Sequence, residues 1–307
     1  MTGTSATTNA ADLRAFSYLV GIGVTHSIAP PMHNFISKSL GYDWNFIAQE
    51  CATVEDAVKL FRLPTFAGGV VTMPYKQTIM EHLDGLDEYS IKIGACNNVY
   101  RAADGSLRGT NTDWRGIKGC LTGASDNGRE KPAFIIGAGG ASRAAVYALH
   151  DQLGCNPVYI VNRDRAEVEA LLHDTESYGP GLSVVHLQSL KEAQQVPQNP
   201  FYIVGTVPDF EPKSPEELTA RDILDFFLQF STKGVLLDMC FKPRRTRILK
   251  LGEKRGWHTV EGTMIIAHQI DEQYRLWCGE EKAEDIPRQE AWKVLQKAAE
   301  DSLSINF

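Results

Sequence analysis

The feature that most constrains the fold of this chain is a glycine-rich loop between an apolar strand and a helix. Residues 133–136 read Ala-Phe-Ile-Ile, and Gly137-Ala138-Gly139-Gly140 follows them. A segment of helical period then runs from Ala141 to Leu153, and Gly154 closes it in a C-cap position. Glycines in such a turn let backbone N–H groups approach a pyrophosphate, which the positive end of the helix attracts. The context predicts a dinucleotide site, although a tight turn alone would also explain the glycines.

The end of the next predicted strand, Val158 to Val161, bears on which dinucleotide is bound. It leads into Asn162-Arg163-Asp164, which begins 25 residues after Gly137, where such folds contact the adenosine ribose. Arg163 can pair with a 2′-phosphate, whereas an acid can accept from a free 2′-hydroxyl. Because Asp164 and Glu167 repel a 2′-phosphate, we expect NAD to be preferred, with NADP as the other possible cofactor.

Composition excludes several classes of function. The net charge of −7 gives no electrostatic basis for nucleic-acid binding, and the basic run 242–247 is too short to supply one. No apolar run approaches the ~18 residues that span a bilayer, and residues 1–10, expected to be frayed, lack the order of a signal peptide. The six cysteines form no Cys-x-x-Cys pair, and no histidine pair has metal-ligand spacing. We therefore expect a cytoplasmic protein without a metal, a membrane segment or a nucleic-acid partner.

The order of elements predicts an α/β fold. Short apolar runs alternate with segments of helical period on both sides of the polar connection 123–131, which indicates two series of βαβ units in a chain of 307 residues. Expected strands lie at 18–23, 44–48, 68–72, 133–136, 158–161, 183–185, 201–204 and 234–237, and expected helices at 32–40, 54–62, 141–153, 265–277 and 289–303. In the simplest architecture, the last two helices return to pack on the first domain.

Several ordered motifs accompany the glycine loop. They are Gly21 with His26-Ser27-Ile-Ala-Pro30 and His33-Asn34, Val71-Thr-Met-Pro-Tyr-Lys76, Gly94-Ala-Cys-Asn-Asn98, Gly109-Thr-Asn-Thr-Asp113, Asn162-Arg163, Asp238 with Pro243, and Gly262 with Gln269. With the loop they span about residues 18 to 280. Together they resemble the motifs of the shikimate/quinate dehydrogenase family.

The resemblance implies a mixed α/β substrate-binding catalytic domain at 11–115, a Rossmann-type doubly wound parallel sheet at 116–258 that binds NAD(P), and helices at 259–307 that return to the first domain. It places the active site in the cleft between the domains. It implies hydride transfer that interconverts quinate with 3-dehydroquinate, shikimate with 3-dehydroshikimate, or both. The implied residues are the catalytic pair Lys76 and Asp113, the substrate ligands Ser27, Thr72, Asn97 and Gln269 with Ala29 and Phe241 in the same pocket, and the cofactor contacts Gly137, Ala138, Gly139, Gly140, Ala141, Asn162, Arg163, Asp164, Thr206 and Gly262.

The chemistry is consistent with that pair, since oxidation of an alcohol removes a hydroxyl proton that a lysine beside a carboxylate can carry. Which of the two takes the proton stays open. Taken singly, each residue has a simpler explanation. Lys76 could be a solvated lysine after a turn, Asp113 and Ser27 could cap helices, and Gln269 could be one more polar helix residue.

Two departures from the family's pattern concern the substrate. Ala29 stands where a second serine is usual, and Phe241 stands where a tyrosine is usual. The lost hydroxyls weaken carboxylate binding, while the small Ala29 leaves room for the additional hydroxyl of quinate. We therefore expect quinate to be preferred and shikimate to be a second substrate, in a monomer or homodimer.

Two other interpretations compete with this one. Asn98 replaces a usual threonine, and the three departures together motivate a non-catalytic sensor of quinate or shikimate with the same fold. Such a sensor would be expected to lose Lys76 or Asp113, and both are present. A methylene-tetrahydrofolate type of dehydrogenase also uses a lysine after a tyrosine, but it lacks the set Asn97, Asp113 and Gln269.

Overall fold

The structure is a computed structural model that describes residues 15–179 and 181–307, so the predictions for residues 1–10 lie outside the described residues. The chain divides into two compact units. The first unit contains the described residues up to Gly85, Cys96–Gly109 and Ile270–Ala298, and the second contains Leu86–Ala95, Thr110–Gln269 and Ala299–Phe307. The predicted domains, 11–115, 116–258 and 259–307, are defined by their expected functions, and these bounds stay a prediction.

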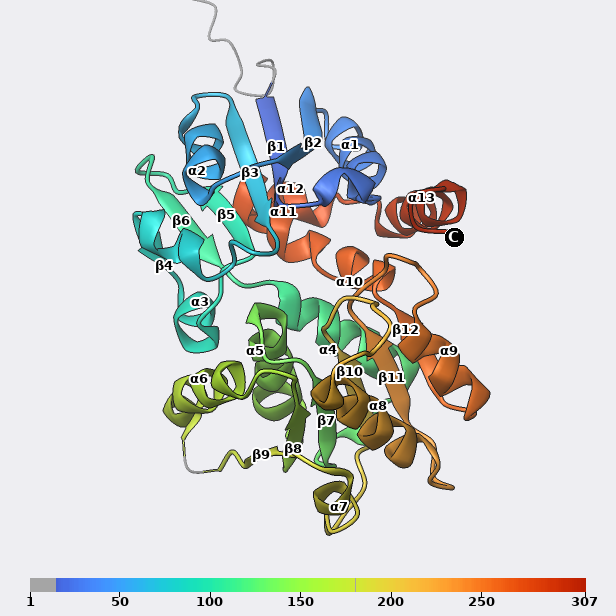
Figure 1. Cartoon of the computed structure of the whole chain (residues 1–307). Coiled ribbons are helices and arrows are strands. Elements are labelled where there is room, and N and C mark those ends of the chain that lie inside the picture. Colours follow the sequence, from blue (N-terminus) through green and yellow to red (C-terminus); the bar gives the residue numbers. More distant parts are fainter. Residues whose placement is uncertain (1–14, 180) are drawn as a thin grey trace, which may run out of the picture. The chain divides into compact units, whose positions relative to one another are not determined.

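The first unit is built on a mixed six-stranded sheet in the order β2-β1-β3-β5-β6-β4 (Figure 1). Strand β1 pairs in parallel with β2 and β3, and β3 pairs antiparallel with β5. Helix α1 packs on β2, and helix α2 packs on β3. The bounds are β1 Ala15–Gly21, α1 Ala29–Ser39, β2 Trp44–Glu50, α2 Val54–Arg62, β3 Phe66–Val71, β4 Gly85–Leu86, β5 Asn98–Arg101 and β6 Leu107–Thr110.

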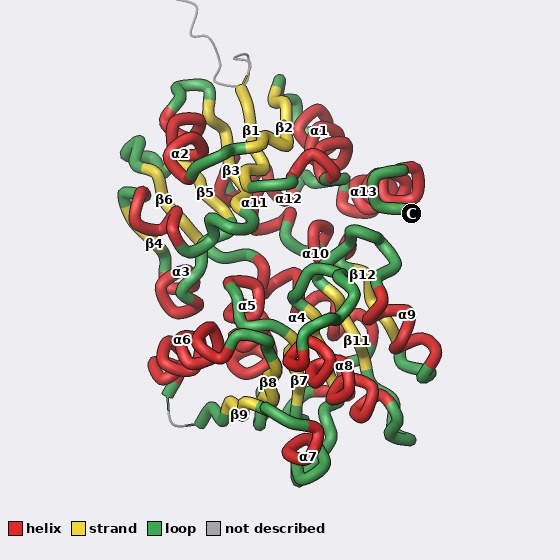
Figure 2. The backbone as a smooth tube through the Cα atoms, viewed as in Figure 1, coloured by secondary structure: helices red, strands yellow, loops and turns green. Residues whose placement is uncertain are grey.

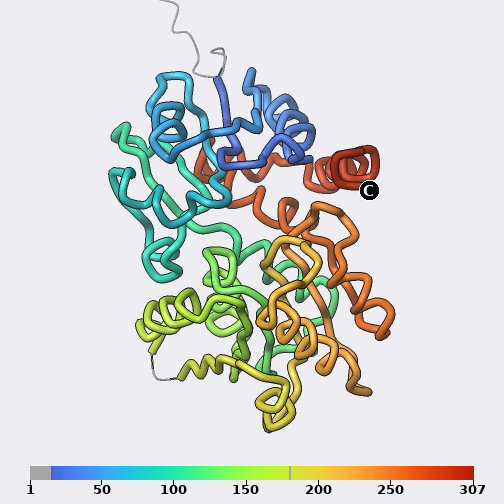
Figure 3. The backbone as a smooth tube through the Cα atoms, viewed as in Figure 1, coloured from blue at the N-terminus to red at the C-terminus, as the bar shows by residue number. Residues whose placement is uncertain are grey.

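The C-terminal helices return to the first unit, as predicted. Helix α11 (Ile270–Cys278) packs on β3 and β5, and Figure 3 shows this late segment beside the early strands. The Tyr274 hydroxyl donates to the His33 carbonyl oxygen of α1 at 2.9 Å. Trp277 covers Gly68 so closely that a Cβ there would lie 2.3 Å from its ring. Helices α12 (Glu280–Glu284) and α13 (Arg288–Asp301) follow.

The second unit has a fully parallel sheet in the order β12-β11-β10-β7-β8-β9, which is the order of a doubly wound dinucleotide-binding sheet. Strands β7, β8, β10 and β11 are buried along their whole length, so their sequences are continuous apolar runs. Figure 2 shows these strands in yellow and the helices around them in red. The strands are β7 Ala133–Ile136, β8 Val158–Val161, β9 Val184–His186, β10 Tyr202–Gly205, β11 Val235–Asp238 and β12 His258–Glu261. The helices are α3 Glu88–Ile93, α4 Asp113–Ala124, α5 Gly140–Tyr147, α6 Arg165–Thr175, α7 Leu190–Ala193, α8 Pro215–Leu228, α9 Arg247–Lys254 and α10 Thr263–Ala267.

Two helical predictions need correction. The single helix expected at 265–277 is wrong, because the chain forms α10 and α11 with a break at His268 and Gln269. The break has a packing cause, since α10 lies against α4 in the second unit while α11 covers the sheet of the first. The helix expected at 141–153 starts as α5 and continues as a π-helical turn, Ala148–Gln152, before Gly154 ends it with a φ of 69°.

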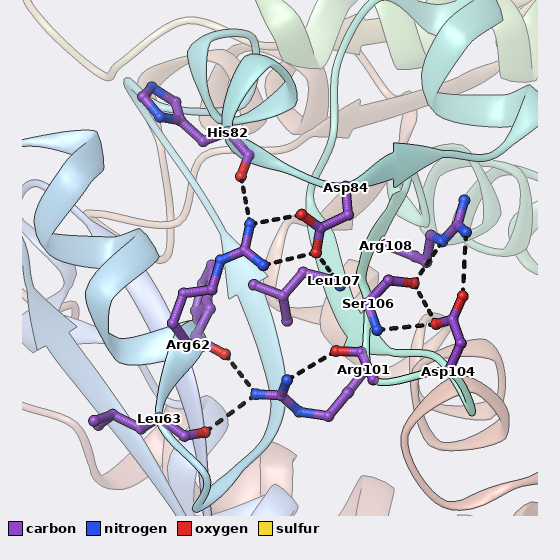
Figure 4. Close-up of polar contacts among 11 residues, drawn as sticks. Arg62, Leu63, His82, Asp84, Arg101, Asp104, Ser106, Leu107 and Arg108 are labelled. Carbon is purple, nitrogen blue, oxygen red and sulfur yellow. Dashed lines mark hydrogen bonds and ion pairs between the residues drawn. The ribbon is translucent and has the colours of Figure 1, made fainter.

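The β5–β6 region of the first unit is fixed by an ion-pair and hydrogen-bond network (Figure 4). The guanidinium of Arg62 makes two bonds to the Asp84 carboxylate, at 2.7 and 2.8 Å. The same carboxylate accepts the backbone N–H of Leu107 at 2.7 Å. Arg101 donates to the carbonyl oxygens of Phe61 and Leu63, so it joins β5 to the end of α2. This network holds β5 and β6, two of the strands that the sequence did not predict.

Among the described residues, no helix is both long enough and apolar enough to cross a bilayer.

Candidate functional site

Three of the predicted site residues are joined through the backbone of the first unit. Thr72 and Lys76 follow β3, and Asn97 precedes β5, the antiparallel neighbour of β3. The Val71 N–H donates to the Asn97 carbonyl oxygen at 2.8 Å, and the Cys96 N–H donates to the Lys76 carbonyl oxygen at 2.7 Å. Asn97 is buried, whereas Thr72 and Lys76 are half-buried. The sheet therefore gathers a hydroxyl, an ammonium and an amide at one end.

Ser27 and Ala29 reach this end of the sheet from the turn after β1. The Glu50 carboxylate, at the end of the neighbouring β2, accepts the backbone N–H groups of Gly23 and Val24 at 2.8 and 2.7 Å. The Ser27 hydroxyl oxygen accepts the N–H of Ala29, the first residue of α1, at 3.3 Å. Ile28, not Ser27, occupies the N-cap position of α1, and no side chain caps this helix, so the capping explanation of Ser27 does not hold. Ala29 is buried.

Gly21 sets how closely the β1 turn and the Thr72–Lys76 segment approach each other. The Ile22 N–H donates to the Met73 carbonyl oxygen at 3.0 Å. A Cβ on Gly21 would lie 2.5 Å from Cγ2 of Thr72 and 2.8 Å from the Met73 oxygen, which real Cβ atoms do not tolerate. The glycine is therefore required for this contact rather than for a special backbone angle.

Asp113 and Gln269 both belong to the second unit, where α4 and α10 pack together. The Thr112 hydroxyl donates to Oε1 of Gln269 at 2.6 Å, and Asn111 Oδ1 accepts the Asp113 N–H at 3.0 Å. Gly116 lets the helices approach, since a Cβ there would lie 2.5 Å from Cγ2 of Ile265 in α10. Thr112, not Asp113, occupies the N-cap position of α4, so the capping explanation of Asp113 does not hold. Asp113 and Gln269 are both buried.

The glycine loop follows β7 as expected and has the geometry of a backbone cradle. The Gly137 N–H donates to the Val161 carbonyl oxygen of β8 at 2.8 Å, and Gly137 has a φ of 117°. A Cβ there would lie 2.2 Å from Oγ1 of Thr206, at the end of the neighbouring strand β10. Gly139 is exposed at the N-terminus of α5, where backbone N–H groups can meet a phosphate. These residues fit a dinucleotide.

Ser142 stands at the third position of the Gly-x-Gly-x-x-Gly dinucleotide pattern, where glycine or alanine is usual, and its contact with Thr206 accounts for the departure. Their hydroxyls are 2.7 Å apart, and Thr206 also donates to the Ile136 carbonyl oxygen at 2.8 Å. Ser142 is fully buried, so its hydroxyl joins α5 to β10 where a glycine or alanine would leave only van der Waals contact. Strand β10 lies beside β7 at the point where the strand order reverses, which is where doubly wound sheets bind ligands.

The turn after β8 holds the residues predicted to meet the ribose. Asp164 caps α6 by accepting the N–H groups of Ala166 and Glu167 at 2.8 and 3.4 Å. Asn162 donates to Oε2 of Glu167 at 2.7 Å. Arg163 is exposed and forms an ion pair of 2.8 Å with Glu217.

Phe241 lies in the loop that follows Asp238, the last residue of β11. Asp238 is buried, and its carboxylate accepts the Thr246 hydroxyl at 2.6 Å and the Cys240 N–H at 3.2 Å. Burial raises the pKa of this carboxyl to about 7, against the hydrogen bonds that favour its charged form. Phe241 is half-buried, and Gly262 precedes α10 next to the backbone of Asp238 and Met239.

The arginines of the basic run 242–247 form ion pairs with acidic side chains. Arg244 and Arg245 pair with Glu261, and Arg247 pairs with Asp209 and Glu211. Three of the four basic side chains in the run are therefore paired with carboxylates. Among residues 15–179 and 181–307, no group of three or more His, Cys, Asp and Glu side chains is arranged to hold a metal ion.

Comparisons with known proteins identify the class of the site. Residues 19–99 match a family model described as the shikimate dehydrogenase substrate binding domain. A quinate dehydrogenase of Emericella nidulans is 35% identical over an alignment of 320 positions, covering 95% of this chain and 97% of that protein.

Solved structures agree. A shikimate 5-dehydrogenase from Thermus thermophilus, in complex with NADP(H) and shikimate, is 27% identical with a TM-score of 0.70, over 92% of this chain and 99% of that one. A shikimate dehydrogenase from Aquifex aeolicus is 25% identical with a TM-score of 0.74, over 94% and 98%. Fold and relatives together define a dinucleotide-dependent α/β dehydrogenase. The chain belongs to the shikimate/quinate dehydrogenase family.

Several supporting residues were missed by sequence reasoning. Glu50 and Thr112 act through contacts with residues distant in the chain, which no local pattern reveals. Glu217 had a readable signal, because Ser214 and Glu217 have the spacing of a capping box, with a proline between them at the first helical position.

Proposed function

We propose that the protein interconverts quinate with 3-dehydroquinate as its main reaction and shikimate with 3-dehydroshikimate as a second one. The observation that carries this proposal is the set of Thr72, Lys76 and Asn97 at one end of a sheet in a chain of this family. These groups suit a hydroxylated ring with a carboxylate. The NAD(P) nicotinamide supplies hydride acceptance and donation at the ring carbon.

We assign proton transfer to Lys76 and Asp113. The ammonium of Lys76 is half-buried, and the carboxylate of Asp113 is buried beside a fixed backbone turn. Removing a hydroxyl proton requires a group that can hold it while hydride leaves carbon, and a lysine with a carboxylate is such a pair. Ser27, Thr72, Asn97 and Gln269 would bind and orient the ring, with Ala29 and Phe241 shaping the pocket.

The cofactor proposal is NAD in preference to NADP. Gly137 to Ala141, Asn162 to Asp164, Thr206 and Gly262 would hold it. The acidic side chains Asp164 and Glu167 in the ribose turn support NAD, because a 2′-phosphate would add negative charge next to theirs. We further propose a cytoplasmic monomer or homodimer that acts on small molecules alone.

The deciding experiment mixes the protein with quinate or shikimate and with NAD or NADP, and follows reduced cofactor by absorbance. We expect the largest kcat/KM with quinate and NAD. A much larger kcat/KM with shikimate would overturn the substrate proposal, and a clearly larger one with NADP would overturn the cofactor proposal. No turnover with any of the four pairs, in a protein that still binds quinate by calorimetry, would instead support the sensor.

A further inference from the structure

The ribose turn and the start of helix α8 are joined by one ion pair. Arg163 lies two residues after Val161, whose carbonyl oxygen is bound by the first glycine of the loop. From this turn its Nη1 reaches Oε1 of Glu217 at 2.8 Å. The guanidinium in the position suited to a 2′-phosphate is thus already bound to a carboxylate.

Glu217 is held in place independently of Arg163. Its Oε2 accepts the backbone N–H groups of Lys213 and Ser214 at 2.9 and 3.1 Å, while the Ser214 hydroxyl oxygen accepts the Glu217 N–H at 3.2 Å. This reciprocal capping box orders the carboxylate before any arginine arrives. The N–H groups of Lys213 and Ser214, together with Arg163, lower the pKa of the Glu217 carboxyl to about 2, so it is charged at neutral pH.

A fixed carboxylate changes what Arg163 can offer a ligand. A 2′-phosphate that took Arg163 would either break the ion pair or share the guanidinium with a carboxylate of its own sign. At a dielectric near that of water, repulsion between two unit charges about 6 Å apart lowers affinity about threefold, and two phosphate charges make this about tenfold. A free 2′-hydroxyl has no such penalty.

We propose that Glu217 is a specificity-determining residue that withholds Arg163 from the 2′-phosphate of NADP and so favours NAD. The proposal rests on the proposed dinucleotide site, and it adds a residue from a different helix to the determinants in the turn itself. Asp164 and Glu167 act by their own charge, whereas Glu217 acts by occupying the cation.

The test compares Glu217→Gln with Glu216→Gln, which removes the same charge from an exposed neighbour in the first turn of α8. The Lys213 and Ser214 N–H groups both donate to the same oxygen of Glu217, so the amide oxygen of a glutamine can accept both and the cap is retained. Calorimetry measures the affinities for adenosine 2′,5′-bisphosphate, which carries the 2′-phosphate, and for ADP, which lacks it, without any turnover. We expect Glu217→Gln to raise the affinity for the bisphosphate by about three- to tenfold and to change the affinity for ADP by less than about twofold. An unchanged bisphosphate affinity, or an equal gain in Glu216→Gln, overturns the proposal.

A second variant leaves the cap untouched. If Arg163 is withheld, Arg163→Gln alone should change the bisphosphate affinity by less than about twofold, whereas in the Glu217→Gln background it should abolish the gain. A loss of about tenfold from Arg163→Gln in the wild-type background would show that the arginine is already available, and would overturn the proposal. Failure of ADP and the bisphosphate to bind the wild-type protein at all would instead overturn the proposed dinucleotide site.

Discussion

The two units place their candidate residues by different means. For the proposed dinucleotide, the second unit uses backbone features: a parallel strand order, a glycine loop with a positive φ and strand ends that meet at one edge. Asp113 and Gln269 of the same unit are held by side-chain contacts instead. The first unit uses side chains on a mixed sheet, positioned by particular contacts such as Glu50 on the β1 turn. A dinucleotide is recognised largely by backbone N–H groups, whereas a ring with several hydroxyls needs a specific set of side chains. Changes to side chains should therefore harm the first unit most, and changes to the backbone should harm the second.

The largest expected effect comes from Lys76. Lys76→Gln removes the proposed proton carrier but keeps a polar side chain of similar length. We expect kcat to fall by about 10²- to 10⁴-fold while ADP affinity stays unchanged, because ADP would be bound by the second unit. Steady-state kinetics with quinate and calorimetry with ADP measure the two quantities. Lys59→Gln, on the exposed surface of α2, is the control. Retained turnover in Lys76→Gln would refute the assignment.

Two glycine variants test the division between the units. Gly137→Ala forces a side chain into a φ of 117° and against Thr206, so we expect a cost of about 1–3 kcal/mol in stability and weaker ADP binding. Gly21→Ala pushes against Thr72, so we expect a higher KM for quinate with normal ADP binding. Gly123→Ala, which meets nothing within 4 Å, is the control. The proposed division between the two units is wrong if Gly137→Ala and Gly21→Ala both weaken the binding of the same ligand.

A smaller effect is expected from the pocket of the first unit. Ala29→Ser restores the hydroxyl that the family usually has near the substrate carboxylate and fills the space left for quinate. Both substrates carry the carboxylate, so the restored hydroxyl serves both alike. Overfilling the space for the additional hydroxyl of quinate costs about 1–3 kcal/mol, so the ratio of kcat/KM for shikimate to that for quinate should rise by about tenfold. Ala57→Ser, a buried alanine of α2, should leave the ratio unchanged. A fall in the ratio would contradict the role of Ala29.

A last comparison concerns the pH dependence of stability, which should differ between one carboxyl of each unit. Asp238 has a folded-state pKa of about 7, above the ~3.9 of an unfolded aspartate, so the folded state binds more protons between these values. The free energy of unfolding should therefore fall as pH rises from about 4 to 7, by at most ~1.4 kcal/mol per pH unit. Urea unfolding across this range should show the slope in the wild type and its loss in Asp238→Asn.

Asp84 provides the opposite case. Its bonds to Arg62 and to the Leu107 N–H lower the pKa of its carboxyl to about 2, so its stabilisation is present above pH about 4 and lost as pH falls toward 2. Asp84→Asn should lower stability at pH 7 and leave the slope between pH 4 and 7 intact. If Asp84→Asn removed that slope and Asp238→Asn did not, the assignment of the two carboxyls would be reversed.

The same contrast explains what the sequence could predict. Strands β7, β8, β10 and β11 could be predicted because burial on both faces leaves continuous apolar runs, and the glycine loop marks the turn between β7 and α5. Strand β12 is partly exposed and was not predicted. Strands β5 and β6 were not predicted, because they are short and depend on Arg62, Asp84 and Arg101, which lie elsewhere in the chain. The break at Gln269 was missed for a related reason. Helical period continues through it, and only packing on two different units shows where the helix must stop.

The capping box of α8 has a consequence for protein engineering. If Glu217 both starts a helix and governs Arg163, then an exchange of coenzyme preference is coupled to the folding of the second unit. A redesign that replaces only the residues of the ribose turn leaves the cation neutralised, and one that deletes the glutamate leaves two backbone donors exposed. The economical route is an uncharged acceptor at this position, introduced before any change to the turn.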